Sequence, residues 1–115
     1  MEKWVVFLLA WTAVLVFTSH ILAKDTGDMV KVNQVGYVPL APKIVIVIDE
    51  GSYDMFQVID TETDLVVYTG TLGRPARDRN SGQTVRHGDF SSLQDSGQYV
   101  VEVPGLGQSY PFIIG

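Results

Sequence analysis

Carboxylates are the most abundant side chains in this sequence that could perform acid–base chemistry. The 115 residues include 13 acidic side chains and only two histidines. Hydrolysis of a glycosidic bond, for example, requires two carboxyl groups across a cleft. Five candidates fall in segments rich in turn-forming residues: Asp49, Glu50, Asp60, Glu62 and Asp64. Carboxylates in such segments usually cap turns in contact with water, so we predict no catalytic pair.

The other reactive side chains indicate neither a metal site nor a nucleophile. His87 is the only histidine after residue 23, and no second ligand stands at a metal-binding spacing from it. Asp78, Asn80, Gly82 and Asp89 faintly resemble a calcium loop. The middle oxygen ligands and the closing glutamate are missing, so an Asx-type turn is the better interpretation. Because cysteine is also absent, which excludes thiol chemistry and zinc fingers, we predict no catalytic residue, no metal and no cofactor.

Exposed aromatic rings could bind a polysaccharide by stacking on its sugar rings. Both tryptophans, Trp4 and Trp11, lie in the first 23 residues. The tyrosines and phenylalanines further along the chain fall mostly at strand or core-facing positions. A flat binding platform therefore has no support in the sequence, and we expect no direct glucan binding.

The first 23 residues have the pattern of a secretory signal peptide. Residues 4–17 are almost wholly apolar, and small Ala23 precedes the polar pair Lys24–Asp25. A short polar start, an apolar core and a small residue at the end define such a signal. We therefore expect residues 1–23 to be cleaved and the product to be secreted, starting at Lys24, with no membrane contact afterwards. An uncleaved membrane anchor remains the alternative, because residues 4–23 could just span a bilayer.

Residues 24–115 have the length of one domain and an acidic balance. Residues 1–23 hold one basic and one acidic side chain, so the rest keeps the net charge of −5. Nucleic acid requires a clustered basic face, whereas Arg74, Arg77 and Arg79 have Asp78 among them. We therefore predict one domain over residues 24–115 that binds no nucleic acid.

The secondary structure around these side chains is predicted to consist of strands. Short β-branched and aromatic runs alternate with turn residues, and no window after Ala23 has the period of a helix. This pattern predicts an all-β fold, an immunoglobulin-like antiparallel sandwich of two sheets and about seven strands. The expected strands are 30–33, 43–49, 55–60, 65–71, 84–88, 98–103 and 109–114, with the polar segment 60–64 as a hairpin loop.

Two local patterns refine this expectation. Leu93, Asp95, Gly97 and Tyr99 predict a tyrosine corner, in which the hydroxyl of Tyr99 binds the backbone a few residues upstream. An ordinary turn before an ordinary strand is the alternative.

The second pattern is the run of five apolar residues at 44–48, where a half-buried strand should alternate apolar and polar residues. Either these residue types simply suit strands on both faces, or another domain covers the outer face.

Several segments together resemble one known family. The block Lys31–Tyr37 is similar to the opening of the N-terminal immunoglobulin-like domain of glycoside hydrolase family 9 enzymes, which are cellulases. The resemblance covers residues 30–114. Its other segments are Pro39, 41–48, 56–60, 67–72, Asp78, 81–82, 89–93, Gly97, Tyr99, 103–107 and 109–112.

The resemblance implies an accessory role. In that family the domain precedes an (α/α)₆ barrel that hydrolyses β-1,4-glucans; the sandwich packs against the barrel, is thought to stabilise it and supplies no catalytic residue. The sequence ends at Gly115, where that barrel would begin, and no family catalytic position has a counterpart here. A fragment, a truncated gene product and a free-standing relative all remain open. The residues expected near the junction with the barrel are Gln34, Tyr37, Tyr110 and Phe112.

The alternative function is an independent carbohydrate-binding or surface-adhesion sandwich. The lack of tryptophan after residue 23 and the apolar run at 44–48 favour the accessory role. Retention on insoluble cellulose would distinguish the two.

Overall fold

The computed structural model describes residues 27–115, which fold into two antiparallel sheets. The expected signal or anchor at residues 1–23 lies outside the described residues, as do the first three residues of the predicted domain. Within the described part, we find no helix long and apolar enough to cross a membrane. The prediction of an all-β, immunoglobulin-like two-sheet sandwich is confirmed.

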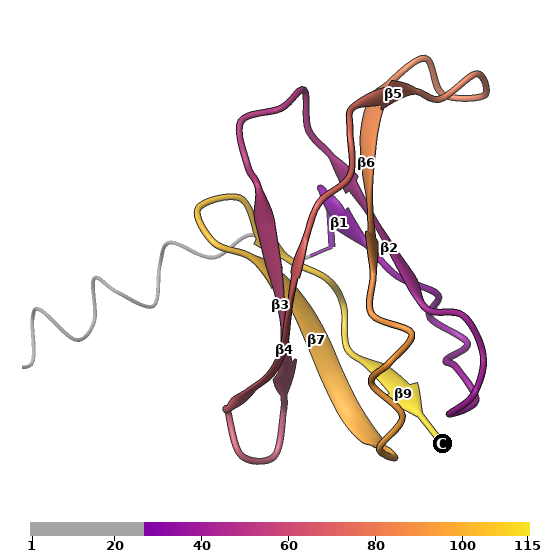
Figure 1. The fold of residues 1–115 in the computed structure, drawn as a ribbon, viewed down its shortest axis with the longest axis vertical. Helices are drawn as coiled ribbons and strands as arrows, with labels where there is room; N and C mark the ends of the chain where they lie inside the picture. The colour runs from indigo at the N-terminus through magenta and orange to yellow at the C-terminus, as the bar shows by residue number, and fades with distance from the viewer. Residues whose placement is uncertain (1–26) are drawn as a thin grey trace, which may run out of the picture.

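Nine strands make up the two sheets (Figure 1). The four-stranded sheet has the order β1-β2-β6-β5, and the five-stranded sheet has the order β4-β3-β7-β8, with β9 also paired to β7. The strands are β1 (Val30–Lys31), β2 (Ile44–Ile48), β3 (Met55–Asp60), β4 (Val66–Thr71), β5 (Ala76–Arg77), β6 (Thr84–Asp89), β7 (Gly97–Val103), β8 (Gly107–Gln108) and β9 (Phe112–Ile114).

The longer strands agree with the sequence prediction, and the differences are confined to short elements. The two-residue strand β5 lies in a segment expected to be a loop. The single strand expected over residues 109–114 is divided into β8 and β9. The residues between β8 and β9 cannot form a regular ladder with β7, because Pro111 has no backbone N–H. In addition, the N–H of Val101 donates to the Ser109 hydroxyl at 2.9 Å and not to a backbone carbonyl oxygen.

The expected hairpin between β3 and β4 is confirmed by their antiparallel pairing. The carboxylate of Asp60 accepts a hydrogen bond from the N–H of Glu62 at 2.8 Å. The N–H of Asp64 donates to the carbonyl oxygen of Asp60 at 2.8 Å, and Asp64 adopts a φ of 60°. Aspartate tolerates this left-handed conformation better than most residues, which explains its position at the end of the turn.

Alternation along the strands builds the core. In β2, Val45 and Val47 are fully buried, whereas Ile44 and Ile46 are exposed on the outer face. Strand β7 buries Tyr99, Val101 and Val103 in the same manner. The apolar run at 44–48 therefore has one core face and one open face.

Phe56 lies at the centre of the core, between a glycine of each sheet. The ring is fully buried. A Cβ atom added to Gly70 in β4 would lie 2.5 Å from the ring, and one added to Gly88 in β6 would also lie 2.5 Å from it. The two sheets can approach Phe56 this closely only because both positions lack a side chain.

We expect Gly88→Ala to lower the free energy of unfolding by about 2 kcal/mol through overpacking. The added methyl group would collide with Phe56 and also with Val45, 2.8 Å away, and both are enclosed by the core. Urea unfolding measures the loss. The double variant with Phe56→Leu should show less than the sum of the two single losses, whereas strict additivity would contradict this steric account.

Candidate interaction surface

Tyr37 ties the loop after β1 to the last strand. Its ring packs edge-on against Phe90 and Phe112, with 5.6 Å between ring centroids in each case. Its backbone N–H donates to the carbonyl oxygen of Ile113 at 2.9 Å, and its own carbonyl accepts from the N–H of Gly115 at 3.0 Å. Burial raises the pKa of the Tyr37 hydroxyl, although the hydrogen bond from the backbone of Asn33 acts in the opposite direction.

Lys43 holds the loop after β1 in place through hydrogen bonds from its buried side chain. Its side chain is fully buried. The ammonium group donates to the carbonyl oxygens of Pro39 at 2.6 Å, Ala41 at 2.9 Å and Ser91 at 3.4 Å. The backbone N–H of Lys43 also donates to the hydroxyl of Ser91 at 2.9 Å. A buried ammonium group is stable only when its donors are satisfied in this way.

The loop held by these contacts presents apolar side chains to solvent beside β9. Val35 is 96% exposed, Val38 61% and Leu40 82%. Tyr110 and Ile113, from the segment that Tyr37 brings alongside, are 49% and 57% exposed. Single exposed apolar residues are ordinary, but several gathered on adjoining segments are typical of an interaction site. These five residues are called the loop–β9 surface below.

The four residues expected at a domain junction take three different positions. Gln34 and Tyr110 line one pocket of about 250 Å³, together with residues at the start of the described chain. Tyr37 is half-buried. Phe112 is only 1% exposed, so its ring packs inside this domain, and its place near a junction stays a prediction. Its place in β9, between the outward-facing Pro111 and Ile113, turns the ring toward the core.

The sequence reasoning missed most of the loop–β9 surface. Val35, Val38 and Leu40 lie in a segment with Gly36, Pro39 and Pro42, which was expected to be a loop. Apolar residues in a loop that cannot join a strand are the signal that could have identified them.

Tyr99 lies at the opposite end of β7 from the β8 pairing. Its hydroxyl donates to the carbonyl oxygen of Asp95 at 2.8 Å, four residues upstream. A Cβ atom at Gly97 would lie 3.0 Å from that hydroxyl, so a side chain at this position would crowd the bond. Burial, followed by the charges of Asp60 and Asp95, raises the pKa of Tyr99.

We expect Tyr99→Phe to keep the fold and lower the free energy of unfolding by about 1–2 kcal/mol, the scale for losing one partly buried hydrogen bond. The urea midpoint should fall while the m-value stays constant. Tyr110→Phe is the matched control, because Tyr110 is half exposed. Equal midpoints for Tyr99→Phe and the unchanged protein would show that the bond does not stabilise the corner.

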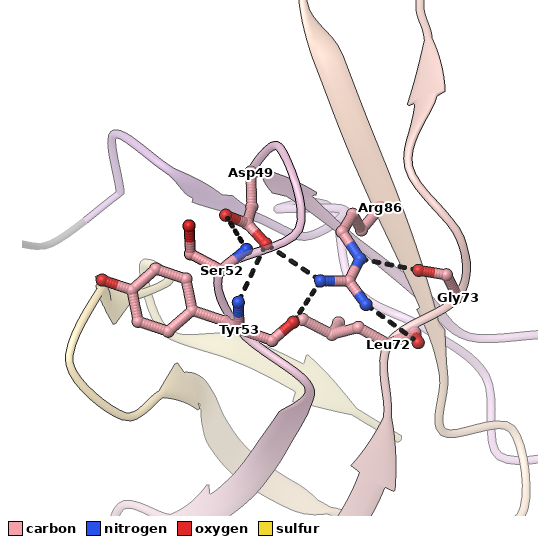
Figure 2. A network of polar contacts seen from close by, with 6 residues as sticks. All are labelled: Asp49, Ser52, Tyr53, Leu72, Gly73 and Arg86. Atoms are coloured by element: carbon pink, nitrogen blue, oxygen red, sulfur yellow. Dashed lines mark hydrogen bonds and ion pairs between the residues drawn. The ribbon is translucent and has the colours of Figure 1, made fainter.

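A buried ion pair lies at the other end of the sandwich, and the further hydrogen bonds of its arginine reach the second sheet (Figure 2). Arg86 of β6 donates from Nη1 to the Asp49 carboxylate at 3.0 Å, and both side chains are at most 7% exposed. The same guanidinium donates to the carbonyl oxygens of Gly73 at 2.6 Å, Leu72 at 3.3 Å and Tyr53. One side chain therefore connects β6 to the turn after β2 and to the chain that follows β4.

Asp49 was expected to be a solvated turn residue, and this was wrong. Its carboxylate is buried, where it accepts from the N–H groups of Ser52 and Tyr53 at 3.2 Å each, in addition to Arg86. Burial alone raises the pKa of Asp49, but the hydrogen bonds from Arg86 and from the turn outweigh it and bring the pKa below the ordinary value. Asp49 caps its turn, as expected, but it does so inside the protein.

Asp78, Asp89 and His87 lie at separate places in the fold and do not share one site. Asp78 accepts from the N–H of Asn80 at 3.3 Å and from the Ser81 hydroxyl at 2.8 Å, which confirms an Asx-type turn. Hydrogen bonds to Ser91 lower the pKa of Asp89 on a different turn. His87 is exposed beside Ile46 on the outer face of the four-stranded sheet. Among residues 27–115, no group of three potential metal ligands is close enough to hold an ion.

The fold and this surface define a class of protein: an immunoglobulin-like sandwich whose described carboxylates discussed above lie in turns, one of them in a buried ion pair, and which exposes several apolar residues on adjoining segments. Residues 25–108 match the sequence profile of the cellulase N-terminal immunoglobulin-like domain. Since the match covers most of the chain, the chain belongs to this family.

Curated relatives contain this region as a small part of a longer protein. Endoglucanase D of Acetivibrio thermocellus is 34% identical over 85 residues, which are 74% of this chain and 13% of that protein. A xyloglucan-specific endo-β-1,4-glucanase of Bacteroides ovatus is 30% identical over 84 residues, 73% of this chain and 14% of that protein. The chain therefore spans about one-seventh of the length of these relatives.

Solved structures give the same result. A metagenome-derived glycoside hydrolase family 9 endoglucanase superimposes with a TM-score of 0.68 at 36% identity, over 75% of this chain and 18% of that one. A family 9 protein of Bacteroides ovatus has a TM-score of 0.65 at 31% identity, over 78% and 16% of the two chains.

Proposed function

We propose that this chain is a non-catalytic accessory domain of a secreted family 9 cellulase, which packs against the catalytic barrel and stabilises it during cellulose degradation. The observation that carries the proposal is the loop–β9 surface. Tyr110 and Ile113 lie on the last segment of the chain, and the backbone of Tyr37 holds the loop with the other three residues beside it, so a domain that follows this one would meet the surface first. Contacts between domains of one chain typically bury 600–1,500 Å², and a surface of five exposed apolar residues suits the lower part of that range.

The positions of the polar residues support the non-catalytic part of the proposal. The Asp49 carboxylate is neutralised by Arg86, and Asp60, Asp78 and Asp89 each cap a turn. Each of these carboxylates is therefore held by hydrogen bonds within its own turn, and that of Asp49 by an ion pair as well.

We expect the domain to raise the melting temperature of a family 9 catalytic barrel. A partner that binds only the folded barrel stabilises it by linkage. The experiment compares the barrel alone, the barrel with this domain added, and a fusion of the two in the order found in the relatives. Leu40→Asp in the fusion should remove most of the increase, because it places a charge on the loop–β9 surface. Leu65→Asp is the matched control, since Leu65 is also largely exposed but lies on the β3–β4 hairpin.

The carbohydrate-binding alternative makes the opposite prediction. A free-standing binding module would be retained on insoluble cellulose and would leave the melting temperature of the barrel unchanged, both added and fused. That pair of results would favour the binding module over the accessory role.

Secretion is tested separately, by N-terminal sequencing of the product from a secreting host, where we expect Lys24 as the first residue. Full-length chain in the membrane fraction would instead assign residues 1–23 as an anchor.

A further inference from the structure

The edges of the two sheets are protected unequally. An unpaired strand edge attracts another strand, and proteins usually prevent this with very short edge strands, charges, proline or a covering segment. The edge strands β1, β5 and β8 have only two residues each. The three-residue strand β9 is covered by the backbone of Tyr37, which forms a bridge with Ile114.

Strand β4 is the least protected edge: its one device is a β-bulge near its start, where the register against β3 shifts between Val58 and Ile59. It forms the outer edge of the five-stranded sheet and has six residues, Val66–Thr71. It contains no charged residue and no proline. Val66, Val67, Thr69 and Thr71 are exposed. One set of alternate backbone N–H and C=O groups on this strand points away from β3, as in any antiparallel edge.

The charges at the two ends of β4 are complementary. The hairpin before the strand carries Asp60, Glu62 and Asp64, and Arg74 follows the strand. If two β4 strands lay antiparallel, the acidic hairpin of one copy would lie beside Arg74 of the other. A parallel arrangement would instead place the two acidic hairpins together. The strand is therefore self-complementary in one orientation, which identifies a second copy of this chain as the partner.

We propose that β4 pairs antiparallel with β4 of a second copy and joins the two five-stranded sheets into one. The pairing leaves the loop–β9 surface free, because β4 and β9 lie on opposite sides of β3 and β7 in the sheet order. The proposal is therefore independent of the proposed function. Thr69, near the middle of β4, lies close to the two-fold axis of such a dimer.

Cysteine cross-linking tests the pairing directly, because the chain has no cysteine of its own. The full 115-residue chain is expressed in a secreting host, and the same assay applies to secreted protein and to the membrane fraction. Under mild oxidation we expect Thr69→Cys to give a disulfide-linked dimer. Ser81→Cys is the matched control, since Ser81 is exposed on the loop between β5 and β6 and should remain monomeric. Equal cross-linking of both variants, or none of Thr69→Cys, would overturn the proposal.

Sedimentation of the purified product measures the affinity from about 1 µM to about 1 mM, a range that covers weak interfaces. We expect reversible dimerisation, and Thr69→Lys should raise the dissociation constant at least about tenfold by placing two like charges together. Gln98→Lys is the control, because Gln98 is exposed on β7, a strand paired on both sides. Arg74→Glu should weaken the dimer, and adding Glu62→Lys should restore it.

Two further results would contradict the proposal. The first is that the purified product sediments as a monomer at every concentration. The second comes from hydrogen exchange on a fusion with a family 9 barrel: if the fusion is monomeric and its β4 amides are protected, this edge contacts the catalytic domain. Failure of barrel stabilisation, by contrast, would leave the dimer intact and would count only against the proposed function.

Discussion

Arg86→Met is expected to lower the free energy of unfolding by about 3–5 kcal/mol, the usual cost of removing one partner of a buried ion pair. The substitution leaves the Asp49 carboxylate buried without its cation. It also removes the donors that satisfy the carbonyl oxygens of Gly73, Leu72 and Tyr53. Since these groups belong to segments from both sheets, the whole sandwich should unfold at a lower urea concentration.

Arg79→Met is the matched control, because Arg79 is exposed and its substitution should change stability by less than about 0.5 kcal/mol. Adding Asp49→Asn to Arg86→Met should recover part of the loss, since no buried charge then remains. Equal stability of the two arginine variants would show that the ion pair does not stabilise the fold.

The pH dependence provides a second measure of the same pair. The pKa of Asp49 is lowered by folding, so its contribution is fully present above the ordinary aspartate value near 3.9 and is lost as the pH falls through the lowered folded value. Without Arg86, the largest of the hydrogen bonds that lower the pKa of Asp49 is lost, so this pKa moves upward from its value in the unchanged protein. The difference in stability between the unchanged protein and Arg86→Met should therefore shrink as the pH falls below about 4. A difference independent of pH would exclude Asp49 from this account.

Lys43→Met should lower the free energy of unfolding by about 3 kcal/mol, because a buried side chain of similar length would lose its bonds to three carbonyl oxygens. The loss should be greatest in the segment that carries Val38 and Leu40. Hydrogen exchange should therefore accelerate at the N–H of Ala41, which donates to the carbonyl oxygen of Val38 at 3.1 Å. Calorimetric or urea unfolding measures the global effect.

Lys31→Met is the control for Lys43→Met, because Lys31 is an exposed lysine of β1. It should leave both the stability and the exchange of Ala41 unchanged. If Lys43→Met were equally silent, the ammonium group would have no part in holding the loop. In a fusion with a family 9 barrel, Lys43→Met should also weaken barrel stabilisation, since it releases the loop–β9 surface from its support.

The strands that could be predicted from the sequence are those long enough to show alternation. Strand β7 alternates buried and more open positions from Gln98 to Val103, and β3 does so from Met55 to Val58, before its register shifts; both strands were expected within one residue of their observed bounds. Strands β5 and β8 have two residues each, and two residues have no period. Their position depends on the neighbours β6 and β7, which no local pattern describes.

The buried charges could not be predicted for a related reason. Arg86 and Asp49 are 37 residues apart, and Lys43 meets Ser91 across 48 residues. A charged residue in a strand is normally exposed, so composition alone indicates a solvated face. The residues expected near a domain junction illustrate the same limit, since Gln34 and Tyr110 line one pocket whereas Phe112 lies in the core. Similarity to a family indicates which segment of the chain lies near a junction. The pleat of β9 then decides which side chains of that strand point outward.

The bridge between Tyr37 and β9 also bears on how the protein folds while it is being made. A nascent chain emerges from the ribosome N-terminus first, so β9 is the last of the nine described strands to become available. Until then, the Tyr37 loop and part of the β7 edge have no partner, and unpaired edges promote aggregation. Pairing between such distant segments is also slow. An interval therefore separates the emergence of β7 from its pairing with β9, and during that interval these edges of the sandwich are open to other chains.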